Sequence, residues 1–178
     1  MTVTTGSALL ERAQPAKDRP LRHFGVSLGH LTEGSAEAWV RSLRLPADAQ
    51  ACTHPAELPF PHVAISVALP AGLALPAEVA GTAFMQAAIA AGSAHAAGRS
   101  GRAIHYRGRS TSSGRVTVGE VLSTTDIVRV NARDTPAEAD DVLEAGRGLT
   151  PHWIAGELTV LAERRPDGLL VPLPGFAR

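Results

Sequence analysis

Apolar and polar residues alternate along several stretches of the chain, which is the pattern of strands buried on one face. Residues 24–29 alternate large apolar residues with glycine and serine. Turn residues follow at 32–35, and residues 36–45 continue in an extended pattern, so these segments together predict a β-hairpin. The same criteria predict a loop at residues 46–61 and further strands at residues 62–69, 102–111, 115–122, 125–133, 153–164 and 169–173.

Residues 76–97 have a helical pattern but lack the charged face of an exposed helix. Pro76 suits a first helical turn, Glu78 suits the positive end of the helix dipole, and no charged residue follows as far as Ala97. A helix that is apolar on nearly all sides must be enclosed by protein or by lipid. A membrane span is the alternative, but the many alanines and the polar residues among them favour a central helix enclosed by protein.

These elements predict one α+β domain. Residues 135–138 read Thr-Pro-Ala-Glu, a capping box, and predict a short acidic helix that ends near Gly146. We expect an antiparallel sheet of about six or seven strands wrapped around one long buried helix, because a curled sheet would cover that helix. The length of 178 residues suits a single domain at residues 21–178, preceded by a flexible N-terminal arm at residues 1–20.

Short motifs around the predicted helix resemble those of a known superfamily. The chain has Pro59-Phe60, His62, Pro70-Ala71-Gly72 and then Phe-Met-Gln-Ala-Ala at residues 84–88. This order is similar to that of carrier-protein dehydratases of the hot-dog fold superfamily, whose helix has an acid four residues before the glutamine; here that position is Thr82. The resemblance implies a hot-dog fold, an acyl thioester as substrate, coenzyme A or an acyl carrier protein as partner, and a homo-oligomer, dimeric or larger.

A polar stripe on the predicted helix supplies candidate catalytic residues. Glu78, Thr82, Gln86 and Ser93 fall within an arc of about 80° at helical spacing. His62 begins a predicted strand and could reach the start of the helix, where a carboxylate partner would let it act as a general base. We therefore expect catalysis by His62, Glu78, Thr82 and Gln86, with Gln86 or Thr82 orienting the thioester carbonyl or a water. Alternatively, these residues only cap the helix and make ordinary hydrogen bonds.

Four basic side chains form a candidate phosphate site. Period-two spacing places His105, Arg107 and Arg109 on one face of a predicted strand, with Arg102 nearby, which suits a phosphate of coenzyme A or of a phosphopantetheine arm. The surrounding residues 79–119 contain five arginines and no acid, whereas residues 120–163 contain nine acids and three arginines. Such a charge distribution can steer an anionic ligand. The alternative is an ordinary solvent-facing sheet whose charges offset one another.

Composition excludes several classes of protein. The formal net charge is zero, which argues against a nucleic-acid binder. The single cysteine, Cys52, excludes a disulfide framework, and together with His54 it lacks the further ligands of a metal site. Neither a metal nor a cofactor is therefore predicted. The beginning of the chain lacks the pattern of a secretory signal, which predicts a cytoplasmic protein.

Two functions of different classes follow as alternatives. The first is a protein that binds or acts on an acyl thioester, such as a thioesterase or a dehydratase or hydratase. The second is a non-catalytic α+β module for oligomerisation or small-molecule binding, in which the polar stripe is structural. Residues 153–161 are the apolar candidate for an edge strand that pairs across a dimer.

Overall fold

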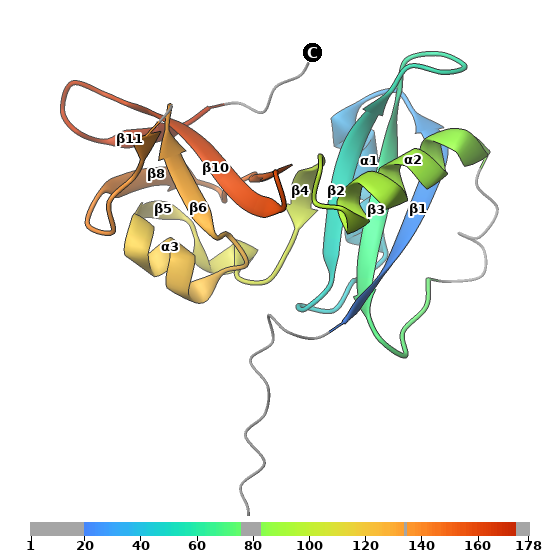
Figure 1. Ribbon diagram of the computed structural model, residues 1–178, viewed down its shortest axis with the longest axis horizontal. Helices are drawn as coiled ribbons and strands as arrows, with labels where there is room; N and C mark the ends of the chain where they lie inside the picture. Colours follow the sequence, from blue (N-terminus) through green and yellow to red (C-terminus); the bar gives the residue numbers. More distant parts are fainter. Residues whose placement is uncertain (1–19, 76–82, 134, 174–178) are drawn as a thin grey trace, which may run out of the picture.

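The computed structural model describes residues 20–75, 83–133 and 135–173, which form an α+β structure with a mixed sheet (Figure 1). In chain order its elements are β1 (Leu21–His30), α1 (Glu33–Ser42), β2 (Gln50–Ala56), β3 (His62–Pro70), α2 (Met85–Ala96), β4 (Arg102–His105), the 3-10 helix η3 (Arg109–Thr111), β5 (Gly114–Thr117), α3 (Val118–Thr124), β6 (Arg129–Ala132), β7 (Thr135–Pro136), β8 (Val142–Gly146), β9 (His152–Ile154), β10 (Glu157–Arg164) and β11 (Leu170–Pro172).

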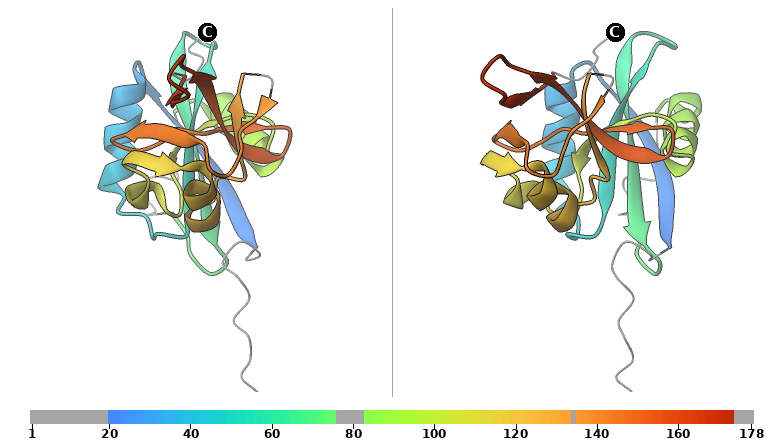
Figure 2. Two further views of the ribbon diagram at one scale, coloured as in Figure 1. Left: turned by 90° about the vertical axis from the view of Figure 1, so that its left-hand side faces the viewer. Right: turned by 60° about the vertical axis from the view of Figure 1, so that its left-hand side comes forward.

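The first half of the chain forms the strand order β1-β3-β2-β4, with a helix on each face. Figure 2 shows α1 and α2 on opposite sides of these strands. Alternation along β3 explains the arrangement, because neighbouring side chains of a strand point to opposite faces. Ile65 and Val67 pack with Val40 of α1. Ser66, between them in the chain, bonds to His95 of α2 instead.

The second half is arranged around β10. This strand pairs with β9 and β11 in antiparallel fashion and with β6 in parallel. The hydrophobic core of this half includes Ile127, Leu143 and Leu158, the last of which belongs to β10. A pairing of β4 with β9, at Arg102 and His152, joins the two halves into one sheet. Strands β9 and β10 each have neighbours on both sides, so the prediction that residues 153–161 form an exposed edge strand is wrong.

Helix α1 replaces the predicted second strand of a hairpin. The side chain of Thr32 accepts a hydrogen bond from the Ser35 backbone N–H and caps the helix, and Glu33 lies in its first turn. Ala36 and Val40, four residues apart, form its buried face. The prediction of a loop at residues 46–61 is wrong in part, because residues 50–56 form β2. This strand lies between β3 and β4 and pairs with both.

Helix α2 is shorter and more exposed than expected. It begins at Met85, after Phe84. Met85 and Ile89 on its outer face are 55% and 61% exposed, whereas its inner face, which includes Ala88, packs on β1 and β3. The sheet therefore does not wrap around one long buried helix, and the predicted helical residues 76–82 lie outside the described residues. No helix in the described parts is long and apolar enough to cross a membrane.

Close backbone packing sets the position of α2. A Cβ atom built on Gly25 of β1 would lie 1.7 Å from the carbonyl oxygen of Ala88. Only a residue without a side chain allows the helix to approach the strand at this distance. This contact places the inner face of α2 directly over the polar residues of β2 and β3.

Several local sequence signals in the second half of the chain predict elements that the structure does not have there. The capping box that forms joins Thr117 and Glu120 and starts α3, within a predicted strand. At residues 135–138 the structure has β7 and a turn in which Asp141 accepts from the Glu138 N–H, so the predicted acidic helix is wrong. The strands predicted at residues 102–111, 115–122 and 125–133 would form a meander if each paired with the next, but β4, β5 and β6 in these segments pair with other strands. The strands predicted at residues 24–29, 62–69 and 169–173 are confirmed as β1, β3 and β11.

Candidate ligand-binding cavity

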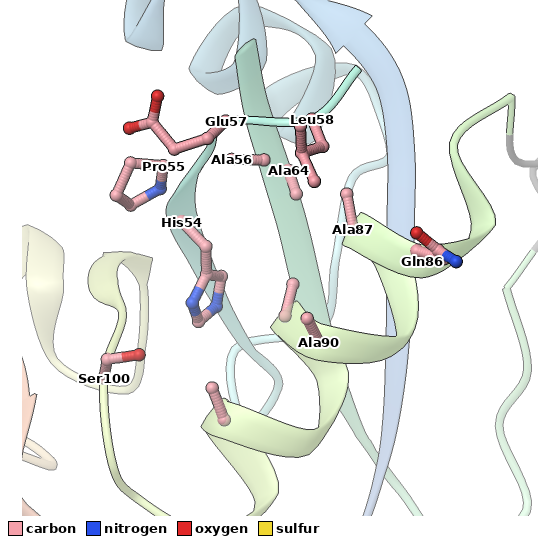
Figure 3. Close-up of a pocket in the computed structure, with 12 residues that line it drawn as sticks. His54, Pro55, Ala56, Glu57, Leu58, Ala64, Gln86, Ala87, Ala90 and Ser100 are labelled. Atoms are coloured by element: carbon pink, nitrogen blue, oxygen red, sulfur yellow. The ribbon is translucent and has the colours of Figure 1, made fainter. Parts of the chain in front are cut away.

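A cavity of about 360 Å³ lies between β2 and α2, and Figure 3 shows its residues. Its size falls within the range of about 300–1,000 Å³ that is typical of small-molecule sites. One wall consists of small side chains of α2, and polar groups lie at the rim and at the inner end. The lining residues are His54, Pro55, Ala56, Glu57, Leu58, Ala64, Gln86, Ala87, Ala90, Ala91, Ala94 and Ser100.

His54 of β2 is the buried polar group of this cavity. Its side chain is buried, and its Nε2 lies 2.8 Å from Ser66 Oγ. Gly101 packs against the imidazole ring, at a place where a Cβ would lie 2.7 Å from His54 Cε1. Burial lowers the pKa of His54 to about 4. The imidazole is therefore neutral at physiological pH and can offer one donor and one acceptor nitrogen.

A row of buried polar residues continues from His54 beneath α2. Ser66 Oγ lies 2.9 Å from His95 Nδ1, and His95 Nε2 lies 3.3 Å from Gln50 Oε1 and 3.8 Å from Cys52 Sγ. Burial lowers the pKa of His95 to about 3, and charge interactions with His23 and His54 act in the same direction. Burial raises the pKa of Cys52 to about 12. The Cys52 thiol and the Ser66 hydroxyl are fully buried, so neither can attack a substrate.

His62, the predicted general base, lies away from this row. Its Nδ1 is 2.7 Å from the Phe60 carbonyl oxygen and its Nε2 is 2.9 Å from Ser27 Oγ. Its ring lies 5.0 Å from that of Phe84, so the imidazole does reach the start of α2. Both ring nitrogens are engaged and the side chain is buried, which suits a structural role.

The other predicted catalytic residues divide into two groups. Gln86 lies in the first turn of α2 and lines the cavity. Glu78 and Thr82 fall outside the described residues. The structure adds His54 and Glu57, which the sequence hypothesis does not include because the pattern of residues 46–61 predicts a loop. It also adds Ser100, which lies between α2 and β4. The spacing of Gln50, Cys52 and His54 at alternate positions is the signal that could have placed them on one face of a strand.

The four basic residues predicted to bind phosphate are engaged within the protein. Arg102 Nη1 lies 2.6 Å from Glu37 Oε1 and 2.9 Å from Glu33 Oε2. Arg107 pairs with Asp126 at 3.0 Å. His105 Nε2 bonds to the Pro46 carbonyl oxygen and Arg109 donates to the Ile104 carbonyl oxygen. Strand β4 ends at His105, so the period of two does not continue to the later arginines.

Pairing of opposite charges extends beyond these four residues. Arg115 of β5 pairs with Glu144 of β8, as Arg107 does with Asp126. Arginines of the basic segment thus bond to acids of the acidic segment that follows it. This arrangement favours the alternative in which the two segments offset each other.

The chain matches no protein-family model, no curated protein and no solved structure. In the described parts of the chain, no group of three or more histidine, cysteine, aspartate or glutamate residues is placed to hold a metal ion.

Proposed function

We propose that this protein binds a small acyl compound, whose hydrocarbon chain lies in the cavity between β2 and α2. The observation that carries the proposal is the alanine surface formed by Ala87, Ala90, Ala91 and Ala94 of α2, with Ala64 of β3 opposite. Alanine side chains leave space beside the helix while keeping its surface apolar. Apolar area removed from water contributes about 25 cal/mol per Å², so a hydrocarbon chain suits this surface.

Charge at the rim favours a neutral acyl group over a free fatty acid. Glu57 is the one carboxylate among the described lining residues, and His54 is neutral. A carboxylate ligand near the rim would lie close to the exposed, negatively charged Glu57, with no cation beside it among those residues. In an acyl thioester, carried by coenzyme A or by an acyl carrier protein, the thioester group takes the place of that carboxylate and has no charge. The resemblance in residues 59–88 supports the same ligand.

Binding is favoured over catalysis by the groups around the cavity. Covalent hydrolysis needs a nucleophile hydrogen-bonded to a base. No hydrogen bond in the described chain joins Ser100 to His54, and Ser66, which is bonded to His54, is fully buried. We therefore propose a small-molecule-binding module rather than a thioesterase or dehydratase. A cytoplasmic location and a homo-oligomeric state are proposed with it, on sequence grounds alone.

Leucine substitutions in the alanine wall test this proposal. We expect Ala90→Leu and Ala94→Leu to weaken the binding of hexanoyl-coenzyme A by about tenfold or more, because added methyl groups occupy the cavity. Ala97→Leu is the matched control, since Ala97 follows α2, is exposed and does not line the cavity. Isothermal calorimetry measures the affinities, and thermal unfolding checks that each variant is folded.

Two results of this experiment would contradict the proposal. One is that the unmodified protein binds neither hexanoyl-coenzyme A nor hexanoate. The other is that all three leucine variants bind like the unmodified protein, which would place the ligand elsewhere. Tighter binding of hexanoate than of the thioester would refute the part of the proposal that rests on Glu57.

A further inference from the structure

An ion pair at one end of the buried polar row determines the direction of its hydrogen bonds. Asp126 pairs with Arg107 through Oδ1, and its Oδ2 lies 3.3 Å from Gln50 Nε2. A carboxylate can only accept hydrogen bonds. The amide N–H of Gln50 therefore donates to Asp126, and the amide oxygen, Oε1, is turned toward His95 at 3.3 Å.

Each following group then has one possible role. Because Gln50 Oε1 is an acceptor, His95 Nε2 must carry a proton, which leaves Nδ1 of the neutral ring as an acceptor. Ser66 donates its hydroxyl proton to His95 Nδ1 at 2.9 Å. Ser66 Oγ in turn accepts from His54 Nε2 at 2.8 Å. His54 is thus protonated at Nε2, and its Nδ1 is left as an acceptor.

His54 Nδ1 has no hydrogen bond in the described chain, although the residue lines the cavity. We infer that the ligand of this cavity donates a hydrogen bond to His54 Nδ1, so that it is an apolar compound bearing a hydroxyl group or an amide N–H. This inference rests on the proposed function and narrows its ligand class. A carbonyl or ether oxygen can only accept a hydrogen bond. A ligand with no other polar atom near His54 would therefore set one acceptor against another, the Nδ1 atom, and no hydrogen bond would form.

The neutral state of both rings supports the assignment. Burial lowers the pKa of His54 to about 4 and that of His95 to about 3, so each imidazole has one proton at physiological pH. A second proton on either ring would remove the acceptor on which the direction of the row depends. At neutral pH the hydrogen bonds of the row therefore run in one direction, because the carboxylate of Asp126 at the far end can only accept.

A pair of ligands that differ in one hydrogen-bond donor tests the inference. We expect 1-hexanol to bind about tenfold more tightly than hexyl methyl ether, because the ether has an acceptor oxygen but no donor. Equal affinities would overturn the inference and leave cavity binding intact. If neither compound binds, and hexanoyl-coenzyme A does not bind either, the proposed function fails.

Two buried serines supply a variant and its matched control. Ser66→Ala removes the acceptor that holds the proton on His54 Nε2, and we expect the preference for the alcohol to fall to less than about threefold. Ser27→Ala also removes a buried serine bonded to a histidine, His62, and should keep the full preference. Loss of the preference in both variants, or in neither, would contradict the role of Ser66.

Nitrogen-15 histidine spectra of the unmodified protein test the row independently of any ligand or variant. The chemical shifts of the two ring nitrogens distinguish the Nε2–H tautomer from the Nδ1–H tautomer. We expect His54 and His95 both to be the Nε2–H tautomer at neutral pH. A protonated Nδ1 on His54 would overturn the inference whatever the binding experiments show.

Discussion

Replacing Gly25 by alanine is expected to lower the free energy of unfolding by about 3 kcal/mol or more. The new Cβ would lie 1.7 Å from the Ala88 carbonyl oxygen and 2.5 Å from its carbonyl carbon. These atoms belong to the backbone of α2, so the helix itself would have to move away from β1. Urea denaturation monitored by circular dichroism measures the change.

Gly34→Ala is the matched control. Gly34 lies in α1, and a Cβ there would have no atom within 4 Å. Alanine is favoured over glycine inside a helix by about 0.5–1 kcal/mol, so this variant should be as stable as the unmodified protein or more stable. A Gly25→Ala variant within about 1 kcal/mol of the unmodified protein would show that α2 does not lie against β1 as described.

Acid is expected to destabilise the protein strongly at a pH where carboxylates are still ionised. The pKa of an unfolded histidine is about 6.5, whereas burial lowers that of His54 to about 4 and that of His95 to about 3. Between these values the unfolded chain binds protons that the folded protein does not. Stability is therefore complete above about pH 6.5 and is lost progressively as the pH falls toward 4 and then 3.

The size of this effect follows from the same values. At about pH 5 each of the two histidines should reduce the free energy of unfolding by about 2 kcal/mol, or about 4 kcal/mol together. Burial also lowers the pKa of His23, His30 and His152, which act with the same sign. Urea denaturation at about pH 7.5 and pH 5 measures the difference.

Two variants distinguish the effect of histidine protonation on stability from the effect of losing a buried hydrogen bond. His95→Gln should reduce the loss between the two pH values by about half, because one buried imidazole is removed. Ser66→Ala should lower stability at both pH values while keeping the difference between them, because both histidines remain. Equal free energies of unfolding at the two pH values would contradict the burial of neutral His54 and His95.

The sequence predicted best those strands whose pattern is local. Residues 62–69 are rich in β-branched residues and alternate clearly, and they form β3. Residues 36–45 mix large and charged residues, so their pattern also fits a period of two, although Ala36 and Val40 follow the helical spacing. The capping box at residues 135–138 failed because a local hydrogen-bonding motif can also stabilise a turn.

The site was harder to predict because it depends on contacts between distant residues. Its polar row joins Gln50 and His54 of β2 to Ser66 of β3 and His95 of α2. No local pattern shows that these side chains meet. The arginines illustrate the same point, since the partner of Arg102 is a glutamate of α1, 65 residues earlier. The sequence does indicate Gln86, because it is one of the few polar residues in a helix rich in alanine.

The most direct test of the cavity as a ligand site is a titration with 1-hexanol, followed by NMR of protein labelled at the alanine methyl groups. We expect saturable shifts of the methyl resonances of Ala87, Ala90, Ala91 and Ala94, which line the cavity. The methyl resonance of Ala36, which lies on the buried face of α1 on the opposite side of the sheet from α2, should not move. Unchanged cavity methyl groups, or shifts of equal size at Ala36, would contradict the account.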